Sequence, residues 1–223
     1  MTSRYEAEFL AQKDDLMDLL SKTTDPLHQK ILKNYRRHSL LEISGRLDEC
    51  IAPDMIVEHP VYKFFEADGK SMILDGPEAV RGFYDALKTT DSMVQWTGRC
   101  KLAVADWGFA GEIEFNQFVP GALLRDGGFS DMADAAKGHP ITPDVGDTDG
   151  IESDGQPFDP DAVYLVRRKF CYVWPYADDG RLKGEQLYED PSAKTLTKVD
   201  PDDVITLERA QELLAPMIET HWP

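Results

Sequence analysis

The chain has 223 residues, which is enough for one large domain with its own hydrophobic core. Its composition, with 42% hydrophobic and 29% charged residues, is typical of a folded globular protein and excludes wholesale disorder. The formal net charge of −17 repels phosphate backbones and anionic lipids, so we expect neither a nucleic-acid partner nor a membrane partner.

We expect neither a membrane span nor an export leader. No stretch approaches the ~18 consecutive apolar residues of a spanning helix, and no basic region followed by an apolar one opens the chain. The three cysteines, Cys50, Cys100 and Cys171, are odd in number and far apart. We therefore expect a reduced, cytoplasmic protein without structural disulfides or a zinc cluster.

Two helices are expected before the first strand. Residues 1–25 carry apolar side chains at near-helical spacing, which predicts an amino-terminal helix. Asp25 is placed to cap a second helix that begins at Pro26. Tyr35 and His38 both fall on the apolar stripe of this second helix, so both are expected to point inward.

Strands follow, with one helix between them. Residues 55–60 alternate and are β-branched, which predicts a strand, and residues 62–74 predict a hairpin turned at residues 67–69. An apolar face predicts a helix over residues 76–87. Residues 93–119 then predict two strands.

The second of these two strands alternates in an unusual way. Ile113 and Phe115 share one face, whereas Glu112, Glu114 and Asn116 share the other. Strands that are this apolar seldom leave either face fully wet. We therefore expect the polar side chains to face a partly buried space.

The pattern of strands is interrupted once before it resumes. Residues 120–161 are rich in glycine, proline and aspartate and predict an inserted loop or lid. Residues 162–174 and 182–188 predict a long hairpin, and residues 200–223 include an amphipathic carboxy-terminal helix. This order predicts a single α+β domain in which helices cover one strongly curved antiparallel sheet.

Three segments carry a family resemblance. Residues 45–60 (GRLDECIAPDMIVEHP) and 74–84 (LDGPEAVRGFY) resemble the front half of the nuclear transport factor 2-like superfamily, and residues 179–191 are similar to its final hairpin. The superfamily includes SnoaL-like polyketide cyclases, ketosteroid isomerases, scytalone dehydratases and the diarylpropane lyases of lignin breakdown. The resemblance implies a cone-shaped α+β barrel around a pocket closed by helices. It also implies a homodimer, and the terminal helices leave a homotrimer open.

The resemblance implies roles for single residues as well. In the isomerases, the position of His59 holds a carboxylate general base. His38 falls where those enzymes place a tyrosine donor, and Tyr172 falls where they place a protonated acid. The isomerase chemistry is therefore not expected to transfer unchanged.

Without the family resemblance, the residue types alone make histidines and glutamates the candidate acid–base groups. His59 and His38 carry imidazoles, which titrate near neutral pH, although each is also explained as a hydrogen-bonded structural histidine. Glu114 and Glu112 are placed to orient a histidine or to take a proton. They are equally placed to pair with basic residues 167–169 on a neighbouring strand.

Aromatic and basic side chains complete the predicted site. Tyr172 and Tyr35 are candidate donors to a developing oxyanion. Arg168 has the same strand parity as Tyr172 and is a candidate partner for a phenolate or carboxylate. Packing in the core is the alternative for each aromatic residue. The candidate substrate contacts are Asn116, Trp96, Phe118, Trp174 and Glu112.

The sequence lacks the motifs that hold a cofactor or a catalytic metal. It has no glycine-rich phosphate loop, dinucleotide fingerprint, nucleophile elbow or zinc-binding His-Glu-x-x-His helix, so we expect no cofactor and no metal. Residues 147–150 match only a fragment of a calcium loop, which favours a solvated lid for the acidic insertion.

Three hypotheses for the function follow. The first is a cofactor-free lyase that eliminates water or formaldehyde from a small aromatic hydroxylated substrate, such as a lignin-derived diarylpropane diol that yields a stilbene. The second is a SnoaL-like cyclase or isomerase that moves a proton on a polyketide or steroid-like substrate. The third is a non-catalytic small-molecule-binding or assembly module.

Overall fold

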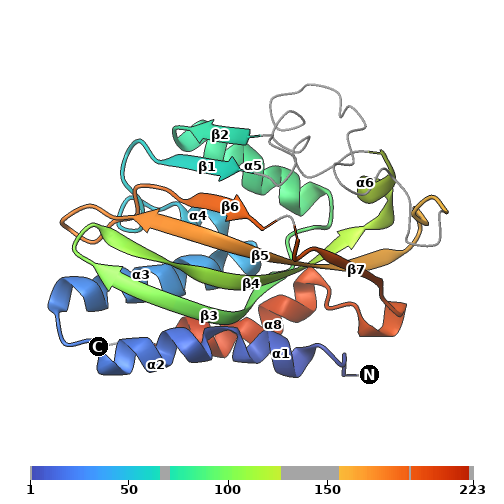
Figure 1. Cartoon of the computed structure of the whole chain (residues 1–223), viewed down its shortest axis with the longest axis horizontal. Helices are drawn as coiled ribbons and strands as arrows, with labels where there is room; N and C mark the ends of the chain where they lie inside the picture. The colour runs from blue at the N-terminus through green and yellow to red at the C-terminus, as the bar shows by residue number, and fades with distance from the viewer. Residues whose placement is uncertain (1, 66–70, 127–155, 191, 221–223) are drawn as a thin grey trace.

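A single mixed sheet organises the chain (Figure 1). The computed structural model describes residues 2–65, 71–126, 156–190 and 192–220. The strand order is β2-β1-β6-β5-β4-β3, and β7 pairs with β5. The strands are β1 (Val61–Phe65), β2 (Ser71–Asp75), β3 (Gln95–Ala105), β4 (Gly108–Pro120), β5 (Val163–Pro175), β6 (Gln186–Glu189) and β7 (Thr195–Lys198).

The predicted α+β class and curved sheet are confirmed, with two corrections. Strands β2 and β3 stand at opposite ends of the strand order, and the sheet is not closed into a barrel in the described part of the chain. The sheet is also not wholly antiparallel, because β1 and β6 run parallel. A register shift between Thr97 and Cys100 interrupts the pairing of β3 with β4, and such a shift bends a strand.

The longest helix begins where its cap predicts. The Asp25 side chain accepts hydrogen bonds from the backbone of Leu27 and His28, and Pro26 occupies the first helical turn of α3 (Pro26–Ile43). The other helical elements are α1 (Glu6–Leu10), η1 (Ala11–Lys13), α2 (Asp14–Lys22), α4 (Leu47–Cys50), α5 (Pro77–Thr89), α6 (Gly121–Asp126), η3 (Pro201–Asp203) and α8 (Leu207–Glu219). None of the helices described is long and apolar enough to cross a membrane.

The helices gather on one side of the sheet. Figure 1 shows α3, α4 and α5 behind the strands, and α8 packs on α3. The amino-terminal segment α1-η1-α2 runs along β3. Most apolar side chains are buried in one large cluster between these layers. This arrangement puts the hollow side of the sheet against α3.

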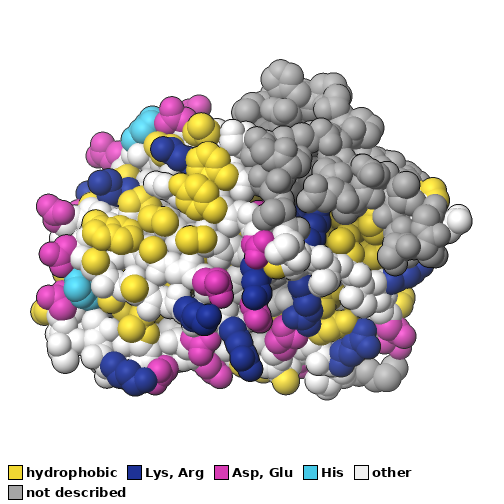
Figure 2. All heavy atoms as spheres, in the orientation of Figure 1, with side chains coloured by type: hydrophobic (Ala, Val, Ile, Leu, Met, Phe, Trp, Pro, Cys, Tyr) yellow, Lys and Arg dark blue, Asp and Glu magenta, His cyan; other side chains and the backbone are white. Residues whose placement is uncertain are grey.

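The opposite face of the sheet is turned to the viewer in Figure 2, where hydrophobic side chains gather at the upper left and charged side chains of both signs gather in the lower centre. Ile73 of β2 is 53% exposed, and the rings of Phe65 and Tyr188 stack at 4.8 Å across β1 and β6. The homodimer or homotrimer expected from the sequence stays a prediction.

Local structure departs from the sequence predictions at residues 55–60, at β7 and at α6. Residues 55–60 do not form a strand, since only Ile56 bridges to Leu182. The short strand β7 is not predicted at all. The turn expected at residues 67–69 and most of the predicted lid lie outside the described residues, although α6 forms at the start of that lid.

We predict that Gly184→Ala strongly destabilises the fold. Gly184 has φ +142°, and a Cβ atom there would lie 1.9 Å from the carbonyl oxygen of Val61. Backbone cannot yield as a flexible side chain can, so we expect a loss of about 2–4 kcal/mol in the free energy of unfolding. Chemical denaturation measures this loss. Gly98→Ala is the matched control, because its nearest atom is a Glu114 side-chain oxygen at 3.0 Å, and equal losses would contradict the prediction.

Candidate active site

A cavity of about 110 Å³ lies between α3 and the hollow side of the sheet. Aromatic and aliphatic side chains form most of its wall, including Phe64, Phe83, Ile113, Phe115, Phe170 and Trp174. The cavity is comparable in size to the ~150 Å³ apolar cavity that accepts benzene in another protein. It therefore has room for one small ring.

Two buried glutamates reach this cavity from different elements. Glu42 comes from the last turn of α3, and Glu185 comes from the residue before β6. Burial raises the pKa of Glu42 to about 7, against the positive charge of Lys13 and a hydrogen bond from Gln95 Nε2, 2.5 Å away, which both lower it. Burial and the charge of Glu42 raise the pKa of Glu185 well above its ordinary value. Near neutral pH, the pair therefore combines a protonated Glu185 with a Glu42 that is ready to exchange a proton.

A buried lysine faces the same cavity. Lys13, in η1, is only 2% exposed, and its Nζ lies 5.4 Å from the centroid of the Tyr35 ring. Burial lowers the pKa of Lys13 to about 8, although the nearby Cys100 and Glu42 both raise it. Nζ has no hydrogen-bond partner within the described chain. The cavity thus contains an amine that is neutral in part of the molecules at slightly alkaline pH.

Two tyrosines supply neutral hydroxyl groups. Tyr35 Oη and Tyr172 Oη are 2.6 Å apart, and both side chains are buried. Burial raises the pKa of each phenol above its ordinary value, so both stay protonated at neutral pH. A hydroxyl pair of this kind donates a hydrogen bond to an oxygen atom that gains charge.

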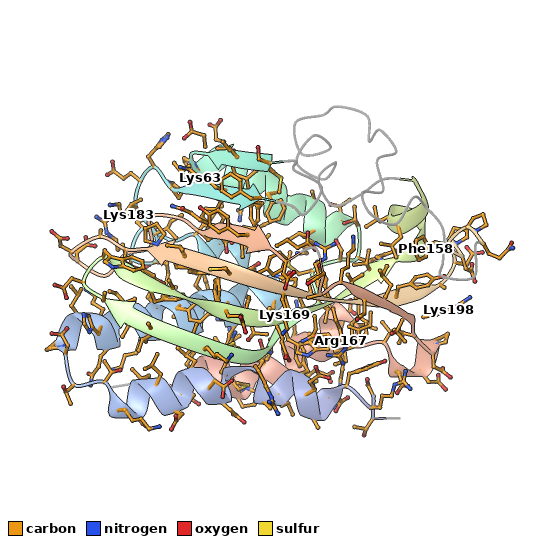
Figure 3. The ribbon with its side chains drawn as sticks, viewed as in Figure 1. Lys63, Phe158, Arg167, Lys169, Lys183 and Lys198 are labelled. Atoms are coloured by element: carbon orange, nitrogen blue, oxygen red, sulfur yellow. The ribbon has the colours of Figure 1, made fainter. Side chains whose placement is uncertain are left out.

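Arg168 and Glu189 form an ion pair on the cavity wall, with Nε and Oε1 3.4 Å apart. Arg167 and Lys169 lie on the face of β5 that is turned away from the cavity (Figure 3), as the strand alternation requires. Arg167 instead binds Glu8 of α1 at 2.6 Å.

The structure does not bring the two predicted histidines together. His38 is fully buried and its Nε2 lies 3.1 Å from Tyr84 Oη, whereas the side chain of His59 is 69% exposed and binds Asp75 at 2.7 Å. His38 and His59, both candidate acid–base groups of one predicted site, therefore do not share a hollow, and the prediction that places them in the same site is wrong. Neither residue lines the cavity, although His38 Nε2 is 4.0 Å from Glu42 Oε2. Burial lowers the pKa of His38 to about 3, so it is neutral at pH 7.

The polar face predicted on β4 also turns away from the cavity. Glu112 and Glu114 are exposed, and Glu112 lies 3.5 Å from Lys101. Asn116 is buried, but its side chain accepts a hydrogen bond from Arg167 and donates one to the backbone of Trp96. Ile113, Phe115 and Gln117 face the cavity instead.

Five predicted site residues do meet at the cavity: Tyr35, Tyr172, Arg168, Trp96 and Trp174. Phe118 does not line it and packs against Tyr5 and Trp96. The catalytic or binding roles of the five cavity residues stay predictions.

Four polar residues central to the cavity were not predicted, although weak signals mark three of them. Glu42 follows His38 by four residues, so it lies on the same helical stripe. Glu185 has the strand parity of Leu187, and Lys13 follows Phe9 by four residues. No sequence signal marks Gln95.

Metal ligands do not cluster in the described residues, where no three His, Cys, Asp or Glu side chains are placed to hold one ion.

The fold and the cavity together define an α+β protein with a small aromatic cavity, whose wall includes two acids, an amine and two hydroxyl groups.

No protein-family model and no curated protein matches the chain. The solved structures that are similar to this chain include the following two. One is the epoxide hydrolase/cyclase-like enzyme SalBIII, reported to act in pyran ring formation in the polyether salinomycin: it is 9% identical, and the match covers 76% of this chain and 97% of that chain at a TM-score of 0.44. The other is a point variant of Rv3472 from Mycobacterium tuberculosis, a protein of unknown function: it is 12% identical, with coverages of 86% and 92% and a TM-score of 0.40. The likeness is loose and concerns the fold alone, and neither structure supports the diarylpropane lyase branch.

Proposed function

We propose that the chain is a cofactor-independent acid–base enzyme, an isomerase or cyclase, that moves a proton on a small and largely apolar substrate. The observation that carries the proposal is Glu42, a carboxyl group with a pKa of about 7 at the wall of an aromatic cavity. A general base works best when its pKa lies near the working pH. Glu185 supplies the second acid, held protonated by burial and by its neighbour.

Glu42 and the two tyrosines have different roles in the proposed proton transfer. The Glu42 carboxylate removes a proton from carbon next to a carbonyl group, while Tyr35 or Tyr172 donates a hydrogen bond to the carbonyl oxygen as it gains charge. The proton returns at another carbon, so the product has the same atoms as the substrate. In a cyclase the same base instead takes the proton of an attacking hydroxyl group.

The size of the cavity narrows the substrate class. About 110 Å³ with aromatic walls suits a single ring, not a steroid or a diarylpropane with two aromatic rings. We therefore propose a single-ring substrate in place of the polycyclic or diarylpropane substrate expected from the sequence.

Elimination of water is the second candidate, because one observation favours it. Glu185 stays protonated beside the cavity and is thus able to protonate a departing hydroxyl group. This is the lyase hypothesis on a smaller substrate, and it differs from isomerisation by the loss of a fragment.

A panel of single-ring probes tests both candidates. The first arm follows the conversion of 3-cyclohexenone to 2-cyclohexenone by the absorbance of the conjugated product, and in heavy water by deuterium uptake. The second arm incubates a single-ring phenolic 1,3-diol and measures released formaldehyde and loss of water by mass spectrometry. Isomerisation without mass loss supports the main proposal, whereas release of a fragment supports the lyase. Binding of the probes without turnover would support a binding module and contradict both.

A further inference from the structure

Lys13 is a buried, charged cavity residue that the proposed proton transfer does not use. It belongs to the amino-terminal segment α1-η1-α2, which runs along β3, and it reaches the cavity beside Gln95 and Trp96. Its Nζ contacts the face of an aromatic ring, and no hydrogen-bond acceptor partners it among the residues described. An amine buried without a partner is costly for a protein, and such groups tend to be present for a ligand.

The surroundings of Lys13 favour the neutral, nucleophilic amine. Burial and the positive charge of Arg36 both lower the pKa of Lys13, and the result of about 8 leaves part of the population unprotonated near neutral pH. The negative charge of Glu42 opposes this and raises the pKa of Lys13. Burial raises the pKa of the nearby Cys100 thiol, which is therefore protonated near neutral pH. Lysines that are desolvated near a second cation are the ones that attack carbonyl carbons in enzymes.

We propose that Lys13 captures a carbonyl compound, an aldehyde or ketone carried on one small ring, as an imine inside the cavity. The inference rests on the proposed function and adds the class of substrate and the mode of its activation. A ketone with its carbonyl carbon at Nζ would place its ring against the aromatic wall and its neighbouring carbon near the acids.

The step is balanced within the cavity. The Nζ lone pair attacks the carbonyl carbon, a C–N bond forms, and a proton moves from nitrogen to oxygen to give a carbinolamine. The protonated carboxyl of Glu185 or Glu42 then delivers a proton to the hydroxyl group, which leaves as water while the C=N bond forms. Amine, carbonyl and the carboxyl proton thus give a protonated imine, water and a carboxylate. The protonated imine withdraws electrons from the neighbouring carbon more strongly than the ketone does, and this makes its proton easier for Glu42 to remove.

Reductive trapping tests the inference on the full chain. We would mix the protein with limiting benzaldehyde and sodium cyanoborohydride, which converts an imine to a stable benzylamine, and locate the label by peptide mapping. We expect Lys13 to be labelled roughly tenfold or more above any exposed lysine, because the neutral fraction grows about tenfold for each unit by which the pKa falls. Equal labelling of surface lysines, or an unlabelled Lys13, would overturn the inference.

Variants make the result independent of folding defects. Lys13→Met should lose the specific label, whereas Lys169→Met, which removes an exposed lysine on the other face of β5, should keep it. The mapping of the unaltered protein decides the question even if Lys13→Met folds poorly.

The same reagents separate this inference from the proposed function. Benzaldehyde has no proton on a carbon next to its carbonyl group, so its capture reports on Lys13 alone. Labelling of Lys13 without any proton transfer on the ketone panel would retain the imine and reject the isomerase. Isomerisation that persists in Lys13→Met, together with absent labelling, would reject the imine and retain the isomerase.

Discussion

Glu42→Gln is expected to lower kcat for proton transfer on the ketone panel by about 10²–10⁴-fold, the contribution typical of a positioned general base. The amide keeps the volume of the carboxyl group and still offers an oxygen to Gln95 Nε2, so the cavity should keep its shape. What is lost is the capacity to take a proton near pH 7. Steady-state kinetics on the isomerised probe measure the loss.

The same variant should be more stable than the unaltered protein above pH 7. In the folded chain Glu42 has a pKa of about 7 against an ordinary value of 4.5, so the folded state keeps its proton longer than the unfolded state. The stability that this protonation provides is complete below pH 4.5 and is lost as the pH rises to about 7. The difference between the two values corresponds to about 3 kcal/mol at pH 8.

Exposed Glu114 provides the control for the kinetic measurement. Glu114→Gln removes the same charge from the opposite face of β4 and should leave kcat unchanged. An ordinary kcat in Glu42→Gln would show that another group is the base. Losses of equal size in both glutamine variants would show that net charge, not position, governs the rate.

Elements with local signals were predictable from the sequence. The start of α3 follows from the Asp25 cap and Pro26, since both act within one turn of helix. The β4 and β5 strands follow from their β-branched and aromatic residues and, in β4, from the alternation over residues 112–116.

Elements that depend on distant partners were not predictable. The parallel pairing of β1 with β6 joins residues more than a hundred positions apart, and no local pattern encodes it. Residues 55–60 have the pattern of a strand, but only Ile56 finds a partner, at Leu182. The four residues of β7 are too few and too polar to show a pattern.

The residues of the candidate site also fall into those that the sequence predicts and those that it does not. Tyr35 was predictable from its helical stripe, and Tyr172 and Arg168 from strand parity, because periodicity reports which side chains turn inward. Charged residues at inward positions, such as Glu42 and Lys13, are usually assigned to the surface, since burial of a charge is rare. Only packing shows that these charges are buried together.

His38→Gln is expected to reduce the acid sensitivity of the fold. The pKa of His38 is about 3 in the folded chain against an ordinary 6.5, because burial excludes the charged form. The unfolded state therefore binds this proton first. Stability is unaffected above pH 6.5 and falls as the pH drops from 6.5 towards 3, by a total of roughly 4–5 kcal/mol.

Urea denaturation between pH 7 and pH 4 measures this effect. Four titratable side chains lie within 4.0 Å of His38, and of these Tyr84, Tyr62 and Cys50 stay neutral over the range because burial raises the pKa of each. The fourth, Glu42, titrates there with the opposite sign, so the comparison is made in the Glu42→Gln background.

In that background His38→Gln should cost about 1–3 kcal/mol at pH 7, because the imidazole packs edge-on against Trp174, and this cost should shrink as the pH falls. His59→Gln is the matched control: its imidazole is 69% exposed and should cost less stability at pH 7 than His38→Gln. Parallel curves for His38→Gln and the background would contradict a neutral, buried His38. A flatter curve of stability against pH for His38→Gln would support a neutral, buried imidazole that stabilises the fold. Proton transfer would then be assigned to Glu42 and Glu185.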